Sequence, residues 1–248
     1  MKARLVWLVL CGIWGSTWLF IKLGLTDLPP LTFAGIRFVI ASIILCSLIA
    51  IRGVPLPRTR RDLLLLAVTG VLLGVIGVGV VLSNQLQVSG PKALWGSAAL
   101  VLSAFCTAYA NVLVKAYGLN LQPSVLAAGQ MIFGLIPLLL VGVSTEGNPL
   151  NLHWTPRAIL AMGYLAVVGS VIAFLLYYWL VQHMQVTKSM LIALVTPVVA
   201  VVLGMLVLDE RLTWRTLAGG AMIICGIGLI VVRRRRRREL EGDFVTAA

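Results

Sequence analysis

Eight apolar stretches make up most of this 248-residue chain, and each is long enough to cross a lipid bilayer. Crossing about 30 Å of hydrocarbon takes about 20 helical residues, whose backbone polar groups bond within the segment. A membrane barrel would instead show short segments of alternating hydrophobicity. The predicted spans are residues 5–24, 31–51, 63–83, 93–117, 124–143, 158–182, 187–208 and 216–232. We therefore expect an all-α integral membrane protein with eight transmembrane helices.

The net charge of +12 is sorted by side of the membrane. With the N-terminus in the cytoplasm, 14 of the 20 Lys and Arg residues fall in cytoplasmic segments, four fall outside, and Lys22 and Arg37 lie within spans. This is the positive-inside asymmetry that sets orientation. We expect a multi-pass protein of the bacterial inner membrane with both termini cytoplasmic. The run Arg233–Arg238 predicts attraction to anionic lipid headgroups, and no nucleic-acid partner is expected.

The chain lacks the patterns typical of an enzyme or a nucleotide-driven pump. Its four cysteines all fall within apolar spans and share no metal-ligand spacing, so neither a metal, a disulfide nor a cofactor is expected. No acid, base and nucleophile lie at catalytic spacing, and no phosphate-binding loop is present. The carboxylates and histidines fall in loops or at span ends, which leaves no proton relay within hydrocarbon. We therefore expect facilitated movement or exchange, unless Glu210 lies deeper in the membrane than the span boundaries place it.

An internal repeat carries more information than any single residue. At a shift of 93 residues, spans one and two match spans four and five, and at a shift of 149, three glycines of span three match glycines of span eight. The matched pairs are Lys22 and Lys115, Leu28 and Leu121, Pro30 and Pro123, Ala34 and Ala127, Arg37 and Gln130, Gly70 and Gly219, Gly77 and Gly226, Gly79 and Gly228. The shifts differ by 56 residues, which is the length of two spans with their loops. We therefore predict a ten-span parent from which the third and fourth spans are missing.

The two copies are predicted to run in opposite directions, because an odd number of spans separates each segment from its partner. Such inverted repeats meet near the bilayer midplane and can expose one site alternately to each side. The predicted units are residues 1–90, a shortened repeat of three helices, residues 91–238, a complete repeat of five, and a cytoplasmic tail at 239–248. Chance similarity between apolar segments is the alternative.

Two basic residues within spans are the first candidates for a substrate path. A charge within hydrocarbon costs at least about 2.5 kcal/mol, so such a residue is a functional candidate by default. Arg37 lies six residues into span two, and Lys22 ends span one at a similar depth. Together they could attract an anionic or carboxylate-bearing substrate. The alternatives are that Lys22 reaches to the headgroups and that Arg37 pairs with backbone carbonyls or Asp27.

Aromatic and uncharged polar residues form the second candidate set. Trp14 and Trp18 share a helix face, as do Ser170 and Tyr178, and such rings could stack on a solute or lie in the interfacial belt. The polar candidates are Ser16, Ser103, Thr107, Asn111, Gln130, Ser170, Ser189 and Thr196. Each Ser or Thr could instead bond the carbonyl one turn back. Pro197, after Thr196, and Pro137 each remove a helix hydrogen bond, so both are candidate hinges.

Several strings resemble the EamA type of the drug/metabolite transporter superfamily. They are Trp14-Gly15-Ser16-Thr17-Trp18, Lys22-Leu23-Gly24, Leu28-Pro29-Pro30, Arg37-Phe38, Gly169-Ser170, Tyr177-Tyr178-Trp179, Thr196-Pro197 and Glu210-Arg211-Leu212-Thr213. The resemblance implies ten helices, both termini inside, and movement of small metabolites or drugs, often outward. This chain departs from the family by two helices. Its third span begins like the family's third helix and continues from Gly70 like the fifth, so the span looks like a fusion.

The departure leaves two functions open. The resemblance implies that the missing helices help to wall the substrate cavity. The gap could collapse, fill with lipid, or be covered by a second copy in a homodimer. We expect an exporter or exchanger of small metabolites or drugs that works by alternating access. The alternative is a non-transporting membrane subunit or an inactive, shortened remnant of such a carrier.

Overall fold

The computed structural model describes residues 2–85, 91–148, 152, 154–185, 188–189 and 191–209, and these ranges contain helices and loops without any strand. The helices are α1 (Lys2–Leu25), α2 (Pro30–Ile51), α3 (Arg60–Gln85), α4 (Pro91–Tyr117), α5 (Pro123–Glu146), α6 (Pro156–Ala166), the π-helix η2 (Val167–Ile172), α7 (Ala173–His183) and α9 (Ile192–Leu208). The prediction of an all-α membrane protein is confirmed for this part of the chain.

Five helices in the described ranges are long and apolar enough to cross a membrane. They are α1, α2, the Arg60–Gly79 part of α3, α5, and the continuous segment Pro156–His183 that α6, η2 and α7 form. The predicted span 187–208 is represented by the 17-residue helix α9, and the predicted span 216–232 lies outside the described residues. The layout of eight helices as three plus five stays a prediction.

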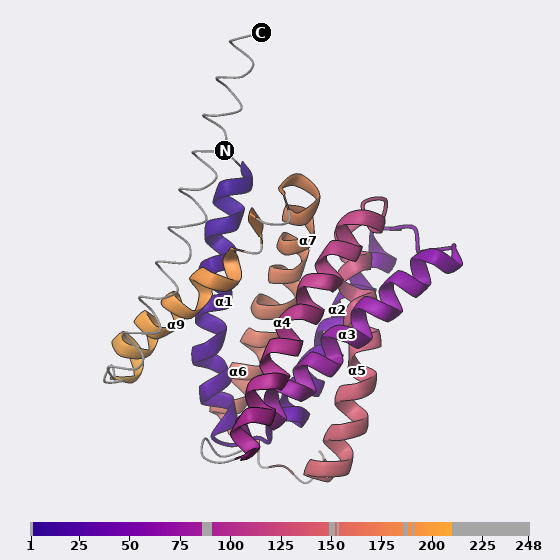
Figure 1. Cartoon of the computed structure of the whole chain (residues 1–248). Coiled ribbons are helices and arrows are strands. Elements are labelled where there is room, and N and C mark those ends of the chain that lie inside the picture. The colour runs from indigo at the N-terminus through magenta and orange to yellow at the C-terminus, as the bar shows by residue number, and fades with distance from the viewer. Residues whose placement is uncertain are drawn as a thin grey trace.

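With α6, η2 and α7 counted as one continuous segment, successive helices along the chain run in opposite directions (Figure 1). Helix α2 packs against α5, and α3 packs against both α4 and α5. Helix α1 contacts α6, α7 and α9 instead, so α1 and α3 belong to different sides of the bundle. This division separates helices that are close neighbours in sequence.

Prolines begin four of the described helices, namely α2, α4, α5 and α6. Pro30, Pro123 and Pro156 each occupy the first turn of α2, α5 and α6, where a missing N–H costs nothing and the fixed φ favours the helix. Pro30 and Pro123 are one of the pairs matched at the shift of 93 residues. The repeat therefore places equivalent helix starts at opposite ends of the bundle (Figure 1).

A carboxylate fastens the start of α2 to the end of α5. Glu146 Oε1 accepts a hydrogen bond from the Leu31 N–H at 2.8 Å, and Oε2 accepts one from the Thr32 N–H at 2.6 Å. These are N–H groups of the first turn of α2, which lack partners within the helix and carry its positive dipole end. Asp27 accepts a hydrogen bond from Thr155 Oγ1 at 2.6 Å at the same end of the bundle. Two acidic side chains thus hold this end together.

Glycines bring the backbones of α3 and α5 into close contact. A Cβ at Gly70 would lie 2.7 Å from the carbonyl oxygen of Gln130, and a Cβ at Gly74 would overlap the carbonyl oxygen of Gly134. Small residues four apart allow membrane helices to approach closely and gain van der Waals contact. This close contact fixes the position of α3 relative to α5.

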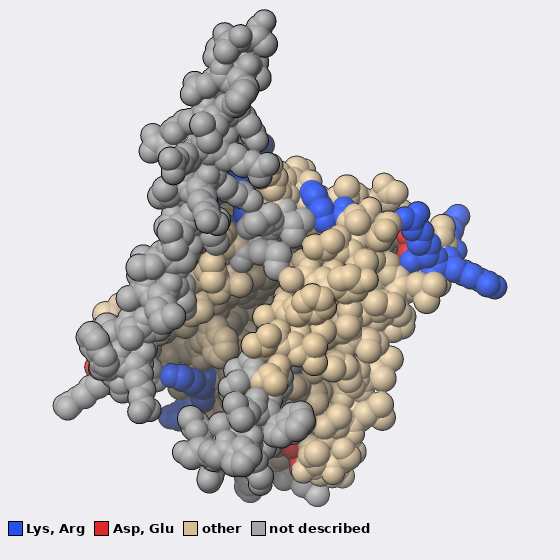
Figure 2. All heavy atoms as spheres, viewed as in Figure 1, with Lys and Arg blue, Asp and Glu red and all other residues tan. Residues whose placement is uncertain are grey.

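The described surface in Figure 2 is a broad uncharged band, with Lys and Arg gathered mainly at the end where α1 and α3 begin. The exposed Arg52, Arg58, Arg60 and Arg61 belong to the connection between α2 and α3 and to the first turn of α3, at that end. Large apolar side chains are exposed along the helices between the ends, for example Leu140 at 69% and Leu160 at 73%. A band of this kind is suited to lipid.

We predict that Gly74→Ala lowers the free energy of unfolding by about 1–3 kcal/mol, because the added methyl forces α3 away from α5. Unfolding of the purified protein in mixed micelles by increasing SDS measures the change. Gly79→Ala is the matched control, since a Cβ at Gly79 on the same helix meets nothing within 4 Å. Equal effects of the two substitutions would contradict the close crossing.

Candidate substrate cavity

A cavity of about 560 Å³ lies between α1, α2, α3, α5 and α7. It runs from the end where α1 and α2 meet, at Leu25 and Pro30, into the bundle as far as Ala127 in the second turn of α5, which begins at the opposite end. The volume is in the range of sites for small metabolites. Most lining side chains are apolar, including Phe33, Phe38 and Phe174. The fully polar ones are Lys22, Arg37 and Gln130.

Matched positions of α2 and α5 both line this cavity, at different depths, because the two helices begin at opposite ends of the bundle. Ala34 and Ala127 both line it, as do Arg37 and Gln130, and Phe38 and Met131 form a third pair at the same shift of 93 residues. Positions spaced by three and four residues share one helix face. The cavity is thus built from equivalent faces of the two helices that the repeat relates.

Arg37 is held by neutral acceptors in a π-helical turn. Its Nε donates to Ser170 Oγ at 2.8 Å, and its Nη2 donates to the carbonyl oxygen of Gly169 at 3.3 Å. Both acceptors belong to η2, where the helix widens to i→i+5 bonding, a feature that often marks a functional position. A Cβ at Gly169 would lie 2.8 Å from Thr17 Cγ2, so glycine allows α1, α2 and η2 to meet there.

The Arg37 charge has no carboxylate partner among the residues that the structure describes. Asp27, which the sequence offered as a partner, bonds to Thr155 instead. The guanidinium carbon lies 5.2 Å from the Phe38 ring centroid, which adds a cation–π contact. Lys22 is a second basic residue of the lining, and none of the described lining residues is acidic.

Two further predicted residues lie at the cavity. Trp18 lines it and is 48% exposed, and Gln130 lines it with only 4% of its surface exposed. Ser170 is fully buried and reaches the site through its bond to Arg37. The structure thus brings Trp18, Lys22, Arg37, Gln130 and Ser170 together.

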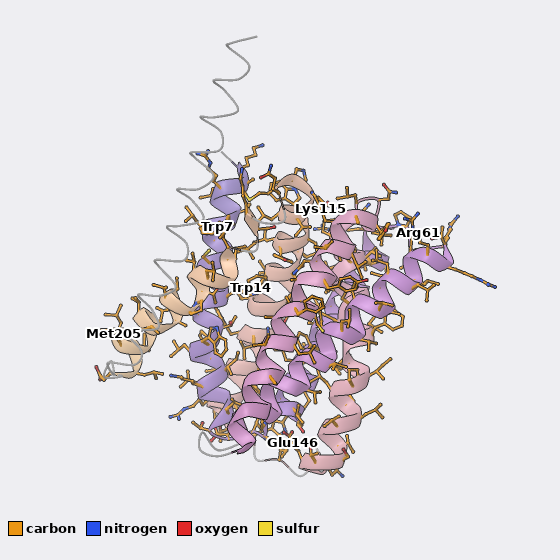
Figure 3. All side chains as sticks on the ribbon, in the orientation of Figure 1. Trp7, Trp14, Arg61, Lys115, Glu146 and Met205 are labelled. Atoms are coloured by element: carbon orange, nitrogen blue, oxygen red, sulfur yellow. The ribbon has the colours of Figure 1, made fainter. Side chains whose placement is uncertain are left out.

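The other aromatic candidates lie behind the cavity wall. Figure 3 labels Trp14 on the part of α1 that faces α7, where its ring packs 5.8 Å from Phe174 and 5.2 Å from Tyr177. Tyr178 is buried in the same cluster, with its ring 5.5 Å from that of Tyr177. Since Phe174 belongs to both the cluster and the lining, Trp14 supports the wall from behind.

The remaining polar candidates bond within or between helices away from the lining. Ser16 Oγ lies 2.6 Å from the hydroxyl of Tyr164. Asn111 donates to the Thr107 carbonyl and accepts from the Tyr177 hydroxyl at 2.7 Å, which ties α4 to α7. The Thr196 hydroxyl donates to the Ile192 carbonyl, and Pro197 lies in the same helix, α9. Pro137 lies inside α5, and Ser189 is buried. The Ser103 side chain lies outside the described residues.

Lys115, which the sequence singles out only as the repeat partner of Lys22, caps the end of α7. Its Nζ donates to the carbonyl oxygens of Val181 at 2.5 Å and of Gln182 and Met184 at 3.4 Å, at the end of α7. A cation there complements the negative end of the helix dipole. Figure 3 shows Lys115 and Glu146 at opposite ends of the bundle. The capping role of Glu146 had no signal in the sequence beyond its position at a span end.

The model of the EamA-like transporter family matches residues 1–93 and again residues 94–232. The chain therefore belongs to the EamA family of the drug/metabolite transporter superfamily. With its apolar helices, it is a multi-pass membrane protein of the transporter class.

Relatives with curated names agree with this membership. The uncharacterized transporter YoaV of Bacillus subtilis is 22% identical, over 91% of this chain and 95% of its own. The uncharacterized inner membrane transporter YedA of Escherichia coli is 28% identical, over 77% and 78%. A protein of Escherichia coli named a probable amino-acid metabolite efflux pump is 23% identical, over 94% and 96%. A crystal structure matches with a TM-score of 0.64 at 16% identity, over 95% of this chain and 98% of that one, and supports the fold.

These alignments leave a similar number of positions without a counterpart in this chain. The alignment with the Bacillus subtilis protein is 279 positions long and uses 91% of the 248 residues here, or about 226, so about 53 positions face a gap. The alignment with the protein named as an efflux pump is 288 positions long and uses 94% of this chain, or about 233 residues, so about 55 positions face a gap. The relatives thus carry a length of two helices that has no counterpart here, close to the 56 residues by which the repeat shifts differ.

We predict that Ser170→Ala lowers the free energy of unfolding by about 1–3 kcal/mol, because the buried guanidinium loses an acceptor. SDS unfolding in mixed micelles measures the change. In a background of Arg37→Leu the same substitution should cost much less, since the donor is gone. Additive costs in this double-mutant cycle would contradict the bond as a stabilising interaction.

Proposed function

We propose that this chain is a carrier that moves a small organic anion across the membrane by alternating access, as an exporter or exchanger. The observation that carries the proposal is the Arg37 guanidinium at the wall of an apolar cavity, bonded by Ser170 and Gly169 and without a carboxylate partner among the described residues. A cation in such surroundings gains most from an anion that enters the cavity. Arg37 lies seven residues into α2, or about 10 Å along the helix axis.

The names of the relatives support transport as the function. We infer the class of substrate from the residues that line the cavity. Two are named transporters, and one is named a probable amino-acid metabolite efflux pump. The apolar lining favours a substrate with an apolar body, and Lys22 and Arg37 favour an anionic group. Such a substrate would be an organic carboxylate small enough for a cavity of about 560 Å³.

The bonds at the two ends of the bundle suit alternating access. The cavity reaches the end that Glu146 fastens. At the other end, Lys115 ties α4 to α7, and Gln182 Nε2 donates to the Leu121 carbonyl at 2.8 Å. In the proposed cycle, the matched faces of α2 and α5 rock about the bound anion, and these two sets of bonds form and break in turn.

A non-transporting subunit or an inactive remnant is the second candidate, because the alignments leave the length of two helices without a counterpart. Under that alternative the cavity would bind and move nothing. The positive cavity wall favours the carrier.

We predict that the purified chain in proteoliposomes exchanges labelled organic carboxylates, and that Arg37→Ala lowers the exchange rate about tenfold or more through loss of a charge-assisted bond. Arg37→Lys should retain part of the activity, since the charge remains. Arg58→Ala, which alters an exposed loop residue, is the control and should change nothing. Exchange of organic cations alone, or an Arg37→Ala protein equal to wild type, would contradict the anion site. Absence of any exchange would favour the non-transporting alternative.

We further propose that a second copy closes the cavity between α1 and α3. Both helices line it, yet α1 packs against α6, α7 and α9 while α3 packs against α4 and α5. Figure 2 shows the described surface hollowed between α1 and α4 in that view. The length of two helices that the relatives have and this chain lacks agrees with an incomplete wall.

We predict that a single cysteine at Leu25, a lining residue at the end of α1, forms a cross-linked dimer under oxidation in native membranes, in a chain without other cysteines. Leu140→Cys is the control, because Leu140 lies two residues beyond the lining Leu138 and so on the opposite face of α5. Cross-linking measured on non-reducing gels should be strong for the first and weak for the second. A monomer with both would contradict the homodimer.

A further inference from the structure

Gln130 carries an unpaired hydrogen-bond acceptor beside the cavity. Its side chain lines the cavity, is 96% buried, and donates through Nε2 to Thr69 Oγ1 at 2.7 Å. The other end of the amide, Oε1, has no hydrogen-bond partner among the residues that the structure describes. Ser42 Oγ is the other buried atom of this kind, but Ser42 does not belong to the cavity lining.

Thr69 fixes which end of the amide is unpaired. A threonine hydroxyl has one hydrogen, and that of Thr69 is donated to the Leu65 carbonyl at 2.6 Å, one turn back in α3. Toward Gln130 the hydroxyl oxygen can therefore only accept, and only the NH₂ group of the amide can donate to it. The orientation of the amide follows from this chain of bonds, and the carbonyl oxygen is the end that is left.

The two matched positions consequently offer opposite chemistry at one cavity. Arg37 of α2 offers N–H donors and a positive charge, whereas Gln130 of α5 offers a neutral acceptor. A buried acceptor without a donor is unfavourable, since it has lost its bonds to water. No described protein group bonds this buried atom, so a molecule that enters the cavity and reaches Oε1 with a donor would satisfy it.

We propose that Gln130 determines substrate specificity by accepting a hydrogen bond from the substrate, which is an organic anion that also bears an O–H or N–H donor. Arg37 binds the anionic group, Gln130 selects for the donor, and Thr69 is a positioning residue that keeps the amide oxygen available. This inference rests on the proposed function. It adds a requirement that an anion site alone would not impose: acids without a donor bind less well than acids of the same skeleton that have one.

Physical chemistry sets the expected size of the discrimination. A site built to bond a substrate hydroxyl rejects the analogue that lacks it, because the protein group is then left unpaired in the complex. A site with only apolar groups would not prefer the hydroxy acid. It would favour the more apolar acid of each pair. The ratio of the two affinities therefore reports on Gln130 separately from the strength of anion binding.

The test uses three pairs of acids that differ only in a hydroxyl at carbon 2: propanoate and lactate, 4-methylpentanoate and its 2-hydroxy derivative, and 3-phenylpropanoate and 3-phenyllactate. Calorimetry measures binding of each to the purified full chain in lipid nanodiscs. The proteins are wild type, Gln130→Leu, Thr69→Val and Arg37→Ala. We expect the wild type to prefer the hydroxy acid by about tenfold or more in at least one pair.

Gln130→Leu should bring that ratio to about one or below, while leaving the affinity for the unsubstituted acid within about threefold, because Leu offers no acceptor. Thr69→Val should reduce the ratio partly, since the amide is then free to turn. Arg37→Ala should weaken both acids of a pair alike. Circular dichroism and size-exclusion chromatography show whether each variant is folded.

Two outcomes would overturn the inference while leaving the proposed function in place. One is wild-type binding that depends on Arg37 but does not distinguish the acids of any pair. The other is a Gln130→Leu protein that keeps the wild-type ratio, or that weakens both acids equally, as expected if Gln130 only ties α3 to α5. Binding that Arg37→Ala does not weaken, or no binding of any acid, would overturn the proposed function and the specificity role with it.

Discussion

The arrangement of this molecule depends on a guanidinium that is bonded inside the bundle by neutral acceptors. A charge at membrane depth costs at least about 2.5 kcal/mol, so it must be surrounded by dipoles to remain. Ser170 Oγ and the Gly169 carbonyl supply those dipoles to Arg37 from the π-helical turn, and the Phe38 ring adds a weaker contact. Because these acceptors are uncharged, the positive charge is solvated without being cancelled. An ion pair in the same place would have removed the reason for an anion to enter.

Small residues make this bonding geometrically possible. Gly169 lets η2 approach Thr17 and Arg37 together, and Gly70 and Gly74 let α3 approach α5 closely enough for Thr69 to meet Gln130. Without the hydrophobic effect to drive helices together in lipid, close backbone contact and interhelical hydrogen bonds carry the association. The packing glycines and the polar groups of the cavity are therefore parts of one arrangement.

Much of the fold and part of the site could be predicted from the sequence. Hydropathy and proline positions gave the helices within a few residues, and the shift of 93 residues singled out Arg37 and Gln130 as equivalent positions, both of which line the cavity. The π-helical turn gave no signal, because Val-Val-Gly-Ser-Val-Ile is compatible with an ordinary helix and widens only in response to its neighbours. The place of Trp14 behind the wall, and of Phe33 and Phe174 in the lining, depends on how helices rotate against one another. Periodicity in a uniformly apolar helix does not determine that rotation.

The different surroundings of Lys22 and Lys115 follow from the proposed loss of two helices. The repeat makes these residues equivalent, each near the end of the first helix of its half. Lys115 donates to the carbonyls at the end of α7, which terminates the third span of the second half. The corresponding helix of the first half is one of the two that the repeat arithmetic removes. Lys22 belongs to the cavity lining. In the proposed scheme, the shortening that opens the wall thus places a second basic residue at the site.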